Sequence, residues 1–159
     1  TNANHVLSDF FDTGEYTPRD SVSTLANAMD VGAPSNLERL RFLYPDKKIH
    51  QAVIKVENVG DDEIRRAIPV TLDRYDEIVC PHTACGMVAL ERLRDANDQR
   101  DWCVVATAHP AKFETVVEPL IQQSIPVPDP LQNLLDRPAH ANLLVPELQA
   151  LKAALENSA

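Results

Sequence analysis

Apolar residues recur at intervals of three and four along most of the chain, a pattern typical of amphipathic helices. Polar and charged residues fill the positions between them. Turn-like stretches interrupt the pattern, most clearly at Gly32 and Pro34. The pattern therefore predicts a series of short helices, over residues 4–11, 35–44, 49–59, 61–68, 83–96, 111–123 and 146–158.

Several residues mark where these helices are expected to begin and end. Asn2 or Asn4 is placed to cap the first helix, because a short polar side chain can accept a hydrogen bond from a free N–H group of the first turn. Ser35 and Glu38 have the spacing of a capping box at the start of the second helix. Pro69 is expected to kink or end the helix before it, since proline lacks the N–H that a helix needs.

One segment indicates a β-strand. Residues 102–106 are continuously apolar, as expected for a strand buried on both faces of a parallel sheet. Helices are predicted on either side, and a helix–strand–helix order is one limb of an α/β fold. A single strand cannot make a sheet, and the opening TNANHVLSDFF has no initiator Met. We therefore expect the chain to be part of a longer protein that supplies the partner strands.

Composition and charge narrow the possible partners. The chain has 159 residues, a formal net charge of −9 and a sequence pI of about 4.9. This acidic balance argues against nucleic acid and against an anionic membrane surface, which both attract clustered Lys and Arg. The sequence has neither an apolar run of membrane-spanning length nor a basic-then-apolar leader, and its three cysteines fit free thiols. A cytoplasmic location is expected.

The stretch CPHTACG at 80–86 contains two cysteines and a histidine within six residues. Cys80, His82 and Cys85, with Cys103 or His109 as a fourth ligand, raise the alternative of a free-standing α/β binding or zinc module. Cys85 near a helix N-terminus could also be a nucleophile of lowered pKa, with His82 or His109 as its base. The zinc-deaminase pattern is absent. We favour buried structural cysteines over both alternatives.

Two further positions indicate a ligand crevice. In open α/β sheets, ligands bind beyond the carboxyl ends of the strands, where Thr107 is predicted to lie. His82 and Thr83 are predicted at the start of a helix, where free N–H groups favour anions. Thr107 could equally be an ordinary last strand residue and Thr83 an ordinary helix cap. The residues alone leave both interpretations open.

Several phrases together resemble one family. TNANHVLSDFFDTGEYTPRDSVSTLANAMDVGAPSNLERL, CPHTACG and VVATAHPAKFETVVEP are similar to segments of threonine synthases, and the resemblance covers most of residues 1–122. It implies a fold class of α/β type: the C-terminal portion of a tryptophan-synthase-β-like pyridoxal-phosphate (PLP) enzyme, helix-rich with one or few parallel strands. Residues 1–124 would belong to the large PLP-binding domain, and residues 125–159 would form a Pro-rich wrapping segment and a C-terminal helix.

The resemblance also implies an activity and site residues. The family are lyases that convert O-phosphohomoserine and water to threonine and phosphate with PLP as cofactor. Thr107 matches the hydroxyl residue expected to hydrogen-bond the pyridine nitrogen of PLP, and a neutral partner does not hold that nitrogen protonated. His82 and Thr83 would lie near the cofactor ring. Asn2 and Asn4 match a polar turn expected to line the substrate side of the site.

The sequence departs from the family pattern in two informative ways. No SFKD-like phrase with the Schiff-base lysine occurs, and none of the five lysines matches it (Lys47, Lys48, Lys55, Lys112 and Lys152). The Gly-rich loop for the cofactor phosphate is also absent. We therefore expect a chain that is inactive alone, that pairs with the N-terminal part of the same protein and that can self-associate through exposed apolar surface. Cys80 stands where the family usually has Asp or a similar polar residue.

Overall fold

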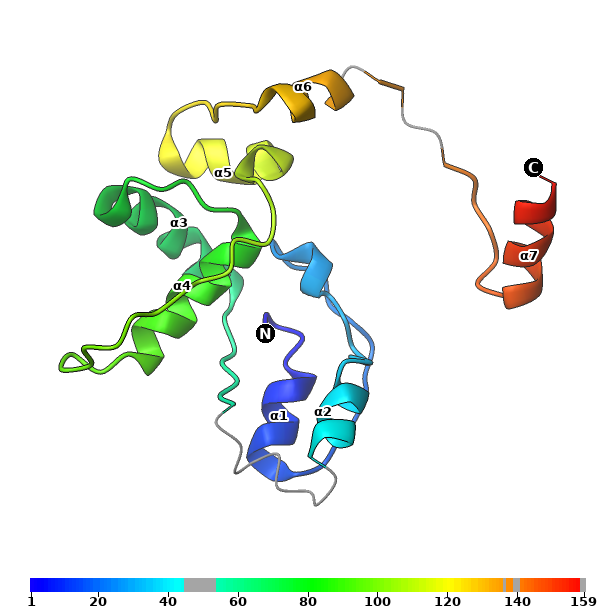
Figure 1. Cartoon of the computed structure of the whole chain (residues 1–159), viewed down its shortest axis with the longest axis horizontal. Helices are drawn as coiled ribbons and strands as arrows, with labels where there is room; N and C mark the ends of the chain where they lie inside the picture. Colours follow the sequence, from blue (N-terminus) through cyan, green and yellow to red (C-terminus); the bar gives the residue numbers. More distant parts are fainter. Residues whose placement is uncertain (45–53, 136, 139–140, 158–159) are drawn as a thin grey trace. The chain divides into compact units, whose positions relative to one another are not determined.

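The computed structural model describes residues 1–44, 54–135, 137–138 and 141–157. The chain separates into two compact units, Thr1–Pro126 and Val127–Ala159. Figure 1 follows the helices along the sequence. The first unit contains α1 (Val6–Thr13), η1 (Asn27–Met29), α2 (Leu37–Leu43), α3 (Asp61–Tyr75), α4 (Pro81–Leu93), η3 (Pro110–Phe113) and α5 (Glu114–Ile121). The second contains α6 (Asp129–Leu135) and α7 (Leu148–Glu156).

The main core of the first unit lies where α3 meets α4 and α5, three neighbouring helices in Figure 1. Ile64 and Ile68 on α3 are completely buried, as are Ala84 on α4 and Val117 on α5. Burying such side chains contributes about 1.5–3 kcal/mol each for the larger ones. This core holds the start of α4 in a fixed place, which matters for the site described below.

A smaller apolar cluster joins α1 to α2. Phe10 and Leu37 are buried at its centre, and Leu7, Phe11, Tyr16 and Leu40 pack around them. The guanidinium of Arg41 lies over the rings of Phe10 and Tyr16, 5.8 and 5.4 Å from their centroids. Aromatic faces attract cations, so this arginine closes the cluster on its outer side.

Most of the predicted helices are present, with shifted ends. Helix α4 starts at Pro81 rather than Thr83, because proline's fixed φ suits the first helical position. Residue His5 precedes α1, and the capping role predicted for Asn2 or Asn4 is wrong. The capping box of Ser35 and Glu38 is also wrong, since α2 begins at Leu37 without a side-chain cap.

Two helix predictions fail for identifiable reasons. Helix α3 continues through Pro69 to Tyr75. Proline removes one hydrogen bond there, and the burial of Ile64 and Ile68 on the same helix offsets that loss. The helix predicted over 49–59 is absent from residues 54–59. The Val59 N–H there donates instead to the Thr1 carbonyl at 2.9 Å. The first part of this predicted helix lies outside the described residues.

The predicted strand is not formed in this chain. Residues 101–107 have no strand partner among the described residues, and the side chain of Val105 is 73% exposed. A strand is stable only when a neighbouring strand satisfies its N–H and C=O groups. The prediction of a strand buried on both faces is therefore wrong for the described part of the chain, because no neighbouring strand is present there to pair with it.

Candidate functional site

The start of α4 is unusually enclosed. Its first five residues, Pro81 to Cys85, are all buried. Cys80 precedes them in an extended conformation, and its side chain makes no capping hydrogen bond to the helix. Buried polar groups at such a helix end need partners. Those partners come from the segment around Thr107 and from the turn that contains η1.

Thr83 and Thr107 meet through a direct hydrogen bond. The Thr107 N–H donates to Thr83 Oγ1 at 3.3 Å. The sulfur of Cys80 lies 3.3 Å from Thr83 Oγ1 and 3.9 Å from Thr107 Oγ1. Thr107 itself is exposed, whereas Cys80 and Thr83 are buried. Two residues predicted to lie near a cofactor, 24 positions apart in sequence, are therefore in contact.

His82 is held from two sides and leaves one polar atom without a partner. Its Nε2 accepts a hydrogen bond from the Ala28 N–H at 3.0 Å, which places the ring proton on Nδ1. Its ring lies against that of Phe113, with centroids 4.9 Å apart. Burial lowers the pKa of His82, although Asp30 acts in the opposite direction. The Nδ1 atom is buried and has no hydrogen-bond partner among the described residues.

Two cavities open beside these residues. One, of about 430 Å³, is lined by His82, Thr107, Cys85, Gly86 and Lys55 among others. The other, of about 560 Å³, is lined by Cys80, Thr83, Ala106 and His109 among others. The segment around Thr107 thus has open space on both sides. Hydroxyl groups and a neutral imidazole beside open space can position a planar polar ligand by hydrogen bonds.

Asn2 and Asn4 lie in a separate, saturated network. Asn2 Nδ2 donates to Thr24 Oγ1 and to Asp30 Oδ1, both at 2.7 Å, and to the Ala26 carbonyl at 3.2 Å. Asn2 Oδ1 accepts from the N–H and the Nδ2 of Asn4. Asn4 also exchanges hydrogen bonds with the backbone of Val22. Asn4 additionally lines a third cavity of about 350 Å³, so it borders open space as well.

The cysteine alternatives receive no support. No group of three or more His, Cys, Asp or Glu side chains within the described ranges is placed to hold a metal ion. His109 accepts a hydrogen bond at Nδ1 from the Ala111 N–H and so begins η3. The prediction that the pKa of Cys85 is lowered is wrong, because burial raises it to about 11. A thiol of that pKa is almost fully protonated at neutral pH and is a poor nucleophile.

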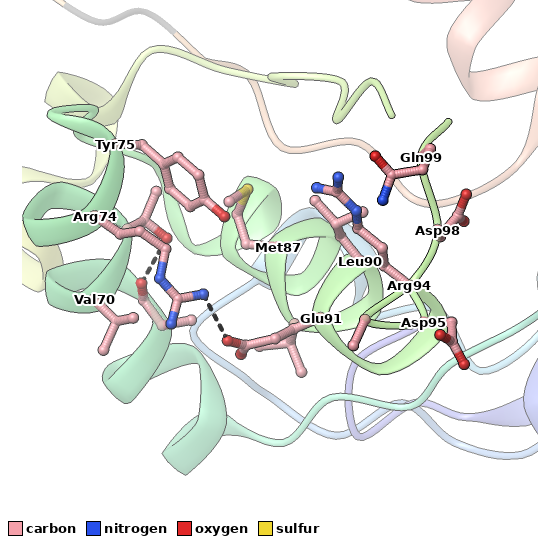
Figure 2. Close-up of a pocket in the computed structure, with 14 residues that line it drawn as sticks. Val70, Arg74, Tyr75, Met87, Leu90, Glu91, Arg94, Asp95, Asp98 and Gln99 are labelled. Atoms are coloured by element: carbon pink, nitrogen blue, oxygen red, sulfur yellow. Dashed lines mark hydrogen bonds and ion pairs between the residues drawn. The ribbon is translucent and has the colours of Figure 1, made fainter. Parts of the chain in front are cut away.

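Sequence reasoning missed a further cavity on the other side of α4. Figure 2 shows it between α3, α4 and the following turn, with Tyr75, Met87 and Leu90 beside charged side chains. Its volume is about 270 Å³. Arg74 is paired there with Glu91 at 3.0 Å, and Asp98 is paired with Arg100 at 2.6 Å. The charge-rich run 91–101 was the available signal, but ion pairs within the chain use many of those charges.

Comparison with known proteins shows which family this chain resembles. A family model described as "Threonine synthase, C-terminal" matches residues 83–155. Threonine synthase from Buchnera aphidicola subsp. Acyrthosiphon pisum is 32% identical over 156 residues, which cover 98% of this chain and 35% of that protein. The chain is a relative of the threonine synthases. Threonine synthase from Escherichia coli strain K12 is 31% identical over 158 residues, covering 99% of the chain and 36% of that protein.

Solved structures agree with the sequence matches. The crystal structure of threonine synthase from Escherichia coli superposes with a TM-score of 0.87 at 27% identity, covering all of this chain and 36% of that one. The PLP-bound threonine synthase from Brucella melitensis gives 0.73 at 25% identity, covering 99% and 39%. The chain thus spans about a third of the length of the threonine synthases it matches. The predicted family and fold class are confirmed, and the free-standing zinc module is not supported.

Among the described residues, no helix has both the length and the apolar character needed to cross a membrane.

Proposed function

We propose that this chain is the C-terminal part of a PLP-dependent threonine synthase, a carbon–oxygen lyase that converts O-phosphohomoserine and water to threonine and phosphate. The observation that carries the proposal is the contact between Thr83 and Thr107 beside His82 and the 430 Å³ cavity. In this proposal the chain supplies one wall of the site, and the N-terminal part of the same protein supplies the Schiff-base lysine and the phosphate-binding loop.

The residues present fit the cofactor. Thr107 Oγ1 has one described hydrogen-bonding contact, the weak one to Cys80, and where it accepts in that contact its O–H can donate to a ring nitrogen. The His82 Nδ1 proton is unused, and its neutral ring adds no positive charge near that nitrogen. PLP, when bound, supplies the electron sink of the reaction. Thr107 would orient the ring through a neutral hydrogen bond, and His82 and Thr83 would shape the wall next to it.

The proposal also assigns roles to residues away from Thr107. Asn2 and Asn4 would shape the substrate side of the site, and their saturated hydrogen bonds support a positioning role more than direct binding. Three free cysteines support a cytoplasmic location. Phe42 and Val105, 85% and 73% exposed, support docking of the N-terminal part of the protein or self-association of the chain alone.

The test compares the isolated chain with the full-length protein that carries it. Phosphate release from O-phosphohomoserine is expected only from the full-length protein, and the isolated chain is expected to show no absorbance band of lysine-bound PLP. Lys55 lines the cavity, so a Lys55→Ala variant of the isolated chain identifies any adventitious reaction of its amine. Turnover by the isolated chain, or none by the full-length protein, would contradict the proposal.

Thr107 provides the sharper version of the same test. Thr107→Val removes the hydroxyl and keeps the side-chain volume, and PLP affinity of the full-length protein is expected to fall roughly fivefold to tenfold, the value of about one hydrogen bond. Thr107→Ser keeps the hydroxyl and is the matched control. Equal PLP affinity of the valine and serine variants would rule out the proposed role.

A further inference from the structure

We propose that Cys80 is a positioning residue that aims the Thr107 hydroxyl at the cofactor. The inference rests on the proposed function and extends it to a residue to which the resemblance assigned no role at the cofactor. Cys80 has an exposed fraction of 0% and belongs to no disulfide. It also does not cap α4, although it occupies the position where a capping side chain would lie. Its thiol is therefore available to the two threonines beside it.

The three groups form a closed set of contacts between two segments of the chain, the start of α4 and the residues before η3. Cys80 precedes α4, Thr83 lies in its first turn, and Thr107 precedes η3. The sulfur is 3.3 Å from Thr83 Oγ1 and 3.9 Å from Thr107 Oγ1, and the Thr107 N–H donates to Thr83 Oγ1 at 3.3 Å. Each member therefore contacts the other two.

The proposed role needs one of the two possible directions of donation in this set. In that direction Thr83 Oγ1 accepts from the Thr107 N–H and donates its own O–H to the sulfur of Cys80. The S–H of Cys80 then donates to Thr107 Oγ1. Because Thr107 Oγ1 then accepts a hydrogen bond from Cys80, the Thr107 O–H can donate to a group other than Cys80 and Thr83. In the proposed function the acceptor of that O–H is the ring nitrogen of the cofactor, which carries a lone pair.

A second observation indicates that a ligand belongs at this place. His82 lies between Cys80 and Thr83 in sequence, is 8% exposed, and has a buried Nδ1 without a partner in the described part of the chain. It lines the same 430 Å³ cavity as Thr107. Buried donors normally find acceptors. The unused protons of His82 and Thr107 thus belong to two neighbouring side chains at one cavity.

The opposite direction of donation makes a different prediction. If Cys80 donated to Thr83, the Thr107 hydroxyl would donate to the sulfur and would not be free for a ring nitrogen. Removal of the sulfur would then release the Thr107 proton and strengthen cofactor binding. The sign of the change on removing Cys80 therefore distinguishes the two arrangements.

The experiment uses the full-length protein in its PLP-free form, titrated with PLP. Cys80→Ala removes both the donor and the acceptor, and Cys80→Ser keeps both with a shorter reach. We expect Cys80→Ala to weaken PLP binding roughly threefold to tenfold, as the loss of about one weak to ordinary hydrogen bond. It should also shift the absorbance maximum of bound PLP in the same direction as Thr107→Val. Cys80→Ser should recover part of both effects.

Val117→Ala controls for a loss of stability alone. Val117 is completely buried on α5 and lines none of the four cavities described above. This variant should lower the melting temperature and leave the absorbance maximum of bound PLP unchanged. A Cys80→Ala protein that behaves like Val117→Ala, or that binds PLP as tightly as the wild type or more tightly, overturns the positioning role. A wild-type protein that binds no PLP overturns the proposed function, and this inference with it.

Discussion

The two polar clusters of the first unit differ in how completely their hydrogen bonds are used. Around Asp30, the carboxylate accepts from Asn2, Asn4 and Thr24, and each amide of Asn2 and Asn4 also has partners of its own. Around Thr107, by contrast, the hydroxyl has one weak contact with Cys80, and the neighbouring His82 has a buried Nδ1 without a described partner. Both clusters are built from small polar side chains near the start of a helix.

This difference separates a structural network from a candidate site. A buried polar network in which every group is satisfied stabilises and specifies a fold. A buried donor without a partner is costly, about 1–3 kcal/mol, and persists where another molecule or another part of the protein supplies the acceptor. We therefore expect substitutions around Asp30 to act on stability, and substitutions around Thr107 to act on binding.

The largest expected effect is on stability. Asn2→Ala should lower the free energy of unfolding by about 2–4 kcal/mol, because it removes several buried hydrogen bonds, among them the one to Asp30 and the one from the Asn4 N–H. Denaturant unfolding of the chain measures this change. Asn58→Ala, at an exposed position, is the matched control and should change stability by less than about 0.5 kcal/mol. Similar losses for both variants would remove the distinction between the clusters.

Thr83→Val should have a smaller effect on stability and a visible one on binding. The substitution keeps the buried volume but removes the acceptor of the Thr107 N–H. We expect the free energy of unfolding to fall by about 1 kcal/mol and PLP affinity of the full-length protein to fall roughly fivefold. Calorimetric unfolding and a PLP titration measure the two changes. Thr71→Val, on α3, removes a hydroxyl that donates only to its own helix and should leave PLP affinity unchanged.

His82 should make stability depend on pH. Burial lowers its pKa in the folded protein, so the unfolded chain binds a proton at higher pH than the folded one. The stability that comes from the neutral ring is therefore fully present above about pH 6.5 and is lost as the pH falls below that value. Melting temperatures measured between pH 7.5 and pH 5 should show the decline, and His82→Gln should reduce it. The lowered pKa values of Asp9 and Asp98 place their titration below this window. If the melting temperature of His82→Gln declines as much as that of the wild type, groups other than His82 cause the decline.

The smallest expected effect concerns the thiols. Cys103 is exposed, whereas Cys80 and Cys85 are buried and burial raises the pKa of Cys85 to about 11. An alkylating reagent at pH 7.5 should therefore label Cys103 in the folded chain and label the other two only after unfolding. Mass spectrometry of peptides from the labelled protein identifies the sites. Fast labelling of Cys85 in the folded chain would restore the nucleophile hypothesis.

Local patterns were enough to predict several elements of the fold. The apolar spacing located α4, α5 and α7, because helix periodicity is written in residues three and four apart. The same reasoning missed that α3 continues through Pro69. Packing against α4 and α5 offsets the missing hydrogen bond there, and that packing depends on residues far away in the sequence. The resemblance to threonine synthases rests on several short phrases at once, so errors at single helix ends did not affect it.

By itself, the sequence determined the helical character of the chain, its family and the residue types at the candidate site, since all of these depend on local spacing and on short phrases. Only the tertiary structure decided how the polar side chains are used. Asn2 has its partners at Thr24 and Asp30, and Thr107 has Thr83 and Cys80, each 22 to 28 positions away in the sequence. Burial likewise removed the lowered pKa that the nucleophile alternative needs at Cys85, because desolvation of the buried thiol outweighs the influences that lower its pKa.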